Sequence, residues 1–201
     1  VHLNLSDGAT RRKTWPKRSP LYDAHGHFKG SFGSTFWHRN NKTFLAEIKD
    51  EFRSQIEFLL KCGPSPDHLN SHNHIHAINE VFDMCCGLAM EYEIPFIRLP
   101  RERFYWSAPF SRHLRTWYPI NTVKWALLNT LARKNSVIAQ RAGIKTNHSL
   151  FGILYTGNMS WETLTTPLRR KVTQGEIVEA LLHPAVIDAS TDEDFLKPAL
   201  R

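Results

Sequence analysis

The stretch Asp67-His68-Leu69-Asn70-Ser71-His72-Asn73-His74-Ile75-His76 decides the fold, because it joins a short apolar segment to a cluster of histidines. Asp67–Ser71 is predicted to be a strand, and four of the eleven histidines of the chain fall within the nine residues 68–76. Apolar residues recur at helical spacing on both sides of it, over Phe44–Lys61 and Glu80–Tyr92. A strand between amphipathic helices is typical of a parallel α/β sheet or barrel.

The same alternation continues along the rest of the chain. Further strands are expected over Val1–Leu5, Ile94–Leu99, Leu150–Tyr155 and Ile177–Leu182. Further helices are expected over Ser111–Ala142, interrupted near Pro119, and from Ser160 towards Thr173 with a break at Pro167.

Two segments are predicted to be irregular. Residues 9–42 are rich in Gly, Pro, Ser and Asn and predict a long loop, after which Thr43 is expected to cap the next helix. The polar residues 189–201 are expected to form a loose tail. The length of 201 residues suits a single domain, 1–201.

The composition is that of a globular protein, with 41% hydrophobic and 22% charged residues. No apolar run approaches the roughly 20 residues that a membrane span needs. The three cysteines are odd in number and two of them, Cys85 and Cys86, are adjacent, which favours reduced thiols and a cytoplasmic location.

The net charge of +7 is unevenly distributed. Nine Lys or Arg fall between Arg101 and Lys145 against one acid, Glu102, which can indicate a nucleic-acid, anionic-lipid or acidic-ligand partner, or simply a solvated basic face. Aromatic residues interleave with these cations over 104–134. This mixture predicts a peripheral membrane contact, with ordinary helix packing as the alternative.

The histidine cluster predicts a metal site or an acid–base site, with a solvated loop as the alternative. If the strand continued, His72, His74 and His76 would share one face. If the chain turns after Ser71, they would line the carboxyl end of the strand, where parallel α/β proteins place their sites. His2 lies in the predicted strand Val1–Leu5 just before a turn, and His183 lies at a strand end before Pro184; each could face either the core or a site.

Several segments, taken in order along the chain, are similar to motifs of the YdjC-like carbohydrate deacetylases. The resemblance covers nearly the whole chain and rests on five segments: Val1-His2-Leu3-Asn4-Leu5-Ser6-Asp7-Gly8, His68–His76, Arg98-Leu99-Pro100-Arg101-Glu102, Phe151-Gly152-Ile153 and Leu182-His183-Pro184. The Leu-Pro-Arg-Glu pattern, Asn147-His148 and the Leu-His-Pro-Ala pattern resemble most the hopanoid-biosynthesis-associated branch of that family.

The resemblance implies an α/β fold, an incomplete TIM-barrel-like (β/α) barrel lacking its first strand. It implies hydrolysis of the N-acetyl group of an amino sugar, in the hopanoid branch a lipid-linked one at the periphery of the inner membrane. It also implies one divalent metal ion, Mg or Zn, held by an Asp and two histidines. By position the metal ligands are His2 and His72, and the catalytic proton donor is His183 with His74 as an alternative. The residues expected to bind substrate are Arg98, His76 and His68.

The chain departs from the family in one respect that matters for chemistry. The adjacent Asp-Asp pair, which supplies the metal carboxylate and the general base, belongs to a strand that would precede Val1, so we expect an N-terminally truncated chain. The remaining acids offer no convincing substitute, since Asp7 lies in a turn and Asp67 precedes the cluster.

Two interpretations remain open besides an active deacetylase. An inactive relative that binds sugars would tolerate the missing pair, and a nucleic-acid module would fit the basic charge. No helix-turn-helix, zinc-finger or RRM pattern supports the second, so no nucleic-acid partner is expected. A homodimer also stays open.

Overall fold

The computed structural model describes residues 1–107, 117–157, 159–169 and 174–182. The predicted acid His183, the tail 189–201 and part of the segment 104–134 therefore lie outside the described residues. Two compact units are present: unit one comprises 1–98 and 133–146, and unit two comprises 99–132 and 147–201.

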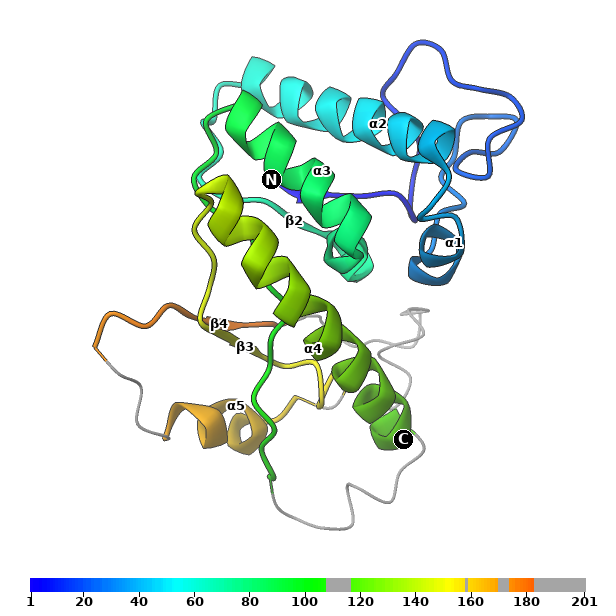
Figure 1. Ribbon diagram of the computed structural model, residues 1–201. Helices are drawn as coiled ribbons and strands as arrows, with labels where there is room; N and C mark the ends of the chain where they lie inside the picture. Colours follow the sequence, from blue (N-terminus) through cyan, green and yellow to red (C-terminus); the bar gives the residue numbers. More distant parts are fainter. Residues whose placement is uncertain (108–116, 158, 170–173, 183–201) are drawn as a thin grey trace. The chain divides into compact units, whose positions relative to one another are not determined.

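Unit one is built on short parallel strands and the helices that connect them (Figure 1). Its elements are β1 (His2–Leu3), α1 (Phe32–Trp37), α2 (Lys42–Lys61), β2 (Asn70–Ser71), the 3₁₀ segment η1 (His72–Ala77), α3 (Asn79–Glu91) and the carboxyl-terminal part of α4 (Trp117–Ala142).

The strands of unit one lie in chain order, each parallel to the next. β1 pairs with β2 in the register His2↔Asn70 and Leu3↔Ser71. Beyond β2 the pairing continues as single parallel bridges, Leu69↔Ile97 and Phe96↔Lys145. The predicted strand Ile94–Leu99 is thus present as bridges only.

The amphipathic helices predicted from apolar spacing are confirmed. Ile48, Phe52 and Ile56 of α2 are fully buried, and α2 packs against α3. The predicted cap was wrong: Asn41, not Thr43, accepts the Phe44 backbone N–H, at 3.2 Å. Asn41 precedes the predicted cap by two residues, so the helix begins two residues earlier than predicted.

The prediction of one irregular loop over 9–42 was also wrong in part, because α1 lies inside it. Ser31 and Ser34 form a reciprocal capping box, in which each side chain bonds the backbone N–H of the other. The helix has only six residues, so it has too few turns to show an apolar periodicity.

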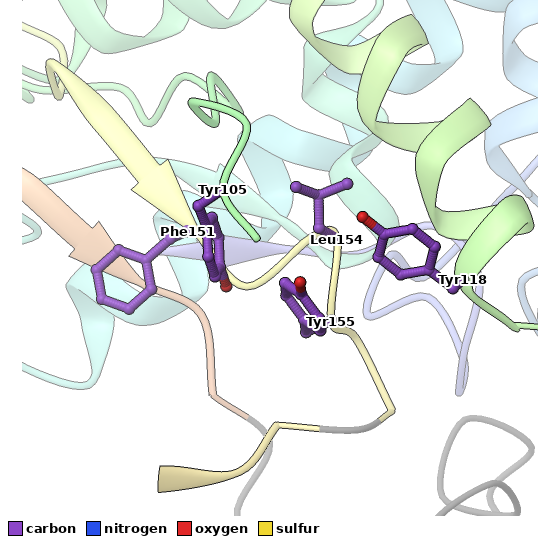
Figure 2. Packing of buried hydrophobic residues seen from close by; sticks show 5 residues of the cluster. All are labelled: Tyr105, Tyr118, Phe151, Leu154 and Tyr155. Carbon is purple, nitrogen blue, oxygen red and sulfur yellow. The ribbon is translucent and has the colours of Figure 1, made fainter. Parts of the chain in front are cut away.

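Unit two contains a second parallel pair, β3 (Ser149–Phe151) and β4 (Val178–Ala180), with Leu150 opposite Glu179. It also holds the first part of α4 and the short helix α5 (Trp161–Leu168), which Ser160 caps as predicted. Figure 2 shows its core, in which aromatic rings gather around Leu154: Tyr105, Tyr118, Phe151 and Tyr155.

Three details of unit two concern predicted breaks and ends. Pro119 lies in the first described turn of α4, where backbone N–H groups have no intrahelical partner to lose, and residues 111–116 of the predicted helix lie outside the described residues, so the interruption near Pro119 stays a prediction. Pro167 lies in the last turn of α5, which ends at Leu168, close to the predicted break. The strand predicted to reach Tyr155 ends at Phe151, because Gly152 adopts a φ of +118° and turns the chain.

The described residues thus form a mixed helix and strand protein with two separate two-stranded parallel sheets. No closed sheet is present among them. The barrel expected from the sequence stays a prediction, as does the single-domain organisation.

Candidate functional site

The pairing of β1 with β2 places His2 beside Asn70. Nδ1 of His2 lies 2.5 Å from Oδ1 of Asn70. An amide oxygen only accepts hydrogen bonds, so Nδ1 carries the hydrogen and Nε2 of a neutral His2 presents a lone pair. Leu3, the next residue, is fully buried, so alternation along β1 directs His2 away from the core.

The electrostatic surroundings favour the neutral form of His2. Partial desolvation lowers the pKa of His2 below its ordinary 6.5. The Asn70 hydrogen bond opposes this change, while the positive groups of His72, Arg98 and the amino terminus reinforce it. A neutral imidazole with one nitrogen bonded to a carbonyl-type oxygen is the usual form of a metal ligand.

His72 follows directly after β2 and lies next to His2. The two rings are nearly perpendicular, at 86°, with their centroids 5.7 Å apart. Nε2 of His72 is 3.1 Å from Oδ2 of Asp7, which comes from the turn after β1. β1, the turn after it and the residue after β2 therefore bring together two imidazoles and one carboxylate.

The chain turns after Ser71, as the second of the two predicted arrangements requires. Asn73 and His74 have φ values of 52° and 56°, in the left-handed region that non-glycine residues seldom adopt. His72, His74 and His76 therefore do not share a strand face. His72 is partly exposed, whereas His74 and His76 are buried.

His76 is held by both of its ring nitrogens. Nδ1 lies 2.7 Å from Oγ of Ser71, and Nε2 lies 3.0 Å from the carbonyl oxygen of Arg98. The carbonyl requires a hydrogen on Nε2, so the Ser71 hydroxyl donates to Nδ1 while accepting the His76 backbone N–H at 2.9 Å. Burial lowers the pKa of His76 to about 3, so the ring is neutral and braces the turn.

The other predicted site residues are differently placed. His68 is 45% exposed and pairs with Asp67 at 2.6 Å, and no ring contact joins it to His2 or His72 in the described part of the chain. His74 is 5% exposed, with its ring 6.4 Å from that of His76. Arg98 lies close enough to lower the pKa values of both His2 and His76.

The donor set fits a divalent metal in part. His2 and His72 fit two ligand positions because their rings are adjacent and Nε2 of His2 carries a lone pair. Within the ranges that the structure describes, no group of three or more His, Cys, Asp or Glu is arranged to hold a metal ion. A third metal ligand is therefore not in position among the described residues.

Unit two contains a buried carboxylate at the end of β3. Glu102 is 1% exposed and accepts the backbone N–H groups of Gly152, Ile153 and Leu154, at 2.6, 3.2 and 2.9 Å. Burial raises the pKa of Glu102 to about 7, although the three N–H groups favour its charged form. Glu102 fixes the segment that follows β3.

Sequence reasoning missed three of these roles. Asn70 orients His2, Asp7 contacts His72, and Glu102 holds the turn after β3. The pairing of Asn70 with His2 depends on a strand register that residue patterns do not reveal. The role of Glu102 could have been suspected because it is the one acid between Arg101 and Lys145. A buried carboxylate needs several hydrogen-bond donors, which here are backbone N–H groups.

Two further observations concern the helices and the cysteines. None of the described helices combines the length and the apolar character that crossing a bilayer requires. Cys62, Cys85 and Cys86 are all free thiols, and burial raises the pKa of Cys86 to about 12. The described residues define a mixed helix and strand protein in which two histidine rings lie side by side on a pair of parallel strands.

Comparison with known proteins identifies the family. The chain belongs to the family described as YdjC-like protein, whose profile matches residues 1–199. It is similar to carbohydrate deacetylases from several organisms. The relative from Enterococcus faecalis is 25% identical over 173 residues, which cover 83% of this chain and 55% of that protein.

Two animal relatives match a shorter part of the chain. The Xenopus laevis carbohydrate deacetylase is 27% identical over 103 residues, covering 51% of this chain and 33% of its own length. The human one is 30% identical over 107 residues, covering 51% and 32%. The chain thus matches between about a third and about half of the length of these relatives.

A solved structure shares the fold. The crystal structure of a candidate cellobiose-phosphate cleavage protein from Enterococcus faecalis superposes with a TM-score of 0.54 at 24% identity. The match covers 94% of this chain and 60% of that one. At this identity the likeness concerns the fold alone.

Proposed function

We propose that this chain belongs to a metal-dependent deacetylase that hydrolyses the N-acetyl group of an amino sugar. The observation that carries the proposal is the His2–His72 pair, set at the ends of adjacent parallel strands in a chain whose relatives are carbohydrate deacetylases. Within this proposal the strands of unit one form part of a TIM-like barrel, and 1–201 is part of one domain.

His2 and His72 would hold the metal, Mg or Zn, and a carboxylate from outside the described residues would complete the ligand set. A bound divalent cation supplies polarisation of the acetamide carbonyl and acidification of a water molecule. The family resemblance favours an adjacent Asp-Asp pair as the source of that carboxylate.

The remaining steps fall to the residues around the pair. Asn70 holds His2 in the tautomer that leaves Nε2 available, and His76 braces the turn that presents His72. Arg98 supplies positive charge beside His2, suited to sugar hydroxyls or a carboxylate. His183, or His74 in its place, would protonate the leaving amine. His68 would contact the sugar.

A lipid-linked substrate is a second part of the proposal, as the resemblance to the hopanoid branch suggests. Apolar side chains at Ile120, Val123 and Leu127 are 67%, 71% and 39% exposed along one face of α4. The 26 residues of α4 include four cations and no acid, which suits an anionic lipid surface at the cytoplasmic side of the inner membrane.

Vesicle co-sedimentation tests the membrane contact. Anionic vesicles should retain the protein and neutral ones should not, and Val123→Asn should weaken retention. Met90→Asn is the matched control, because Met90 is 56% exposed but lies on α3. Equal and negligible binding to both kinds of vesicle would contradict the contact.

Acetate release tests the activity. The complete protein, supplied with Mg²⁺ or Zn²⁺, should release acetate from N-acetylglucosamine oligosaccharides, and His72→Asn should lower the rate at least about 100-fold. His25→Asn, at an exposed histidine, should not. Sugar binding without any acetate release would instead favour an inactive sugar-binding relative.

A further inference from the structure

The turn that follows β1 is built to present one carboxylate. Oδ1 of Asn4 accepts the backbone N–H groups of Ser6 and Asp7, at 3.0 and 3.3 Å. Nδ2 of Asn4 donates to the carbonyl of Asp7 at 2.6 Å. Gly8 closes the turn with a φ of +75°. The backbone on which Asp7 is carried is therefore fixed locally.

The turn is also anchored to the core of unit one. The backbone N–H and C=O of Asn4 bond to the side-chain amide of Gln55 on α2, at 2.9 and 2.7 Å. The same amide donates to Glu51 at 2.9 Å, and Glu51 is fully buried. Movement of the turn would break this partly buried chain of bonds.

The Asp7 carboxylate bridges the turn to the histidine segment. Oδ2 of Asp7 accepts the hydroxyl of Ser6 at 2.8 Å and lies 3.1 Å from Nε2 of His72. Ser6 Oγ in turn accepts from Nδ2 of Asn73 at 3.3 Å. Two contacts thus join the turn after β1 to the turn after β2, one at His72 and one at its neighbour Asn73.

We propose that Asp7 is a positioning residue for His72, as Asn70 is for His2. The carboxylate holds a hydrogen on Nε2 of His72 and so leaves Nδ1 as the nitrogen that can bind a metal. Outer-shell groups of this kind commonly orient metal-binding histidines. Only the part of the inference that concerns metal binding rests on the proposed function, because the tautomer of His72 can be measured without metal.

The exposure of Asp7 and His72 allows a positioning role to be distinguished from a role in stability. The side chains of Asp7 and His72 are 70% and 43% exposed, and exposed ion pairs contribute little to folding. Removing the carboxylate should therefore change the state of the His72 ring while leaving the melting temperature nearly unchanged. A matched control is available in Asp67, which pairs with the exposed His68 at 2.6 Å.

The experiment compares Asp7→Ala, Asp7→Asn and Asp67→Ala in the full chain at pH 8. Ring nitrogen NMR of metal-free protein reports which nitrogen of His72 carries hydrogen, and Zn²⁺ titration reports affinity. Asp7→Ala should mix the two tautomers of His72 and weaken Zn²⁺ binding about 10- to 100-fold. Asp7→Asn should keep most of both properties, because an amide oxygen also accepts.

Three results would overturn the assignment. The first is that His72 keeps one tautomer in Asp7→Ala, and the second is that Asp67→Ala changes the tautomer and the Zn²⁺ affinity as much as Asp7→Ala does. The third is that Asp7→Asn loses Zn²⁺ affinity as fully as Asp7→Ala, which would make Asp7 a direct ligand. Absence of Zn²⁺ binding in the unaltered protein would count against the proposed function instead, and the ring measurement would still decide the role of Asp7.

Discussion

Replacement of His76 by phenylalanine should destabilise the protein by an amount that depends on pH. The change removes the bonds from the ring to Ser71 Oγ and to the Arg98 carbonyl, at 2.7 and 3.0 Å, in a side chain that is 1% exposed. Two buried polar groups, Ser71 Oγ and the Arg98 carbonyl, lose their partner at a cost of about 1–3 kcal/mol each, partly offset by the added apolar ring. The expected loss at pH 7 is about 2–4 kcal/mol.

The sign of the pH dependence follows from the lowered pKa of His76, about 3 against an ordinary 6.5. Below pH 6.5 the unfolded chain takes up a proton that the folded protein cannot accept, so stability that is present above 6.5 is lost as the pH falls towards 3. The phenylalanine side chain takes up no proton in either state, so it adds no pH dependence. The gap in stability between the two proteins should therefore shrink by about 2 kcal/mol from pH 7 to pH 5.

Urea unfolding followed by far-UV circular dichroism at the two pH values measures this gap. His25→Phe serves as the control because His25 is exposed, and its gap should be small at both pH values. A gap for His76→Phe that is the same at pH 5 and pH 7 would refute the reasoning, because His76 would then titrate normally in the folded protein.

Two further predictions concern stability. Burial raises the pKa of Glu102 to about 7 from 4.5, so its contribution to the free energy of unfolding is fully present below pH 4.5 and is lost as the pH rises to 7, by about 3 kcal/mol at most. In Glu102→Gln the free energy of unfolding, measured with urea, should therefore depend less on pH between 4.5 and 7. A dependence as steep as that of the unaltered protein would contradict this. Gly30→Ala should destabilise by about 1–3 kcal/mol, because its Cβ would lie 2.4 Å from the carbonyl oxygen of Leu5, two residues after β1. Gly87→Ala in α3, with nothing within 4 Å, should instead stabilise by about 0.5–1 kcal/mol; thermal melts that rank the two variants in the opposite order would be inconsistent with this packing.

The long helices could be predicted because their periodicity depends only on local sequence. Ile48, Phe52 and Ile56 repeat every four residues, and all three are buried as that spacing requires. The same holds for the cap at Ser160. Elements with fewer residues than two helical turns, such as α1, leave no period to detect.

The site was predictable in its residue types and not in its geometry. The density of histidines marked 68–76, but only the left-handed conformations of Asn73 and His74 separate an exposed His72 from a buried His76. Asp7 was set aside because it lies in a turn. Its contact with His72 depends on the parallel register of β1 and β2, which is a tertiary property.

Divalent-metal binding tests the central claim most directly. Equilibrium dialysis of the full chain against Zn²⁺ and Mg²⁺, followed by metal analysis, should show one ion per chain, lost in both His2→Asn and His72→Asn. Asn substitutions at His25 and His27, an exposed pair with ring centroids 6.4 Å apart, should leave it bound. Binding that survives loss of His2 and His72 together, or that disappears with His25 and His27, would contradict the assignment of the site.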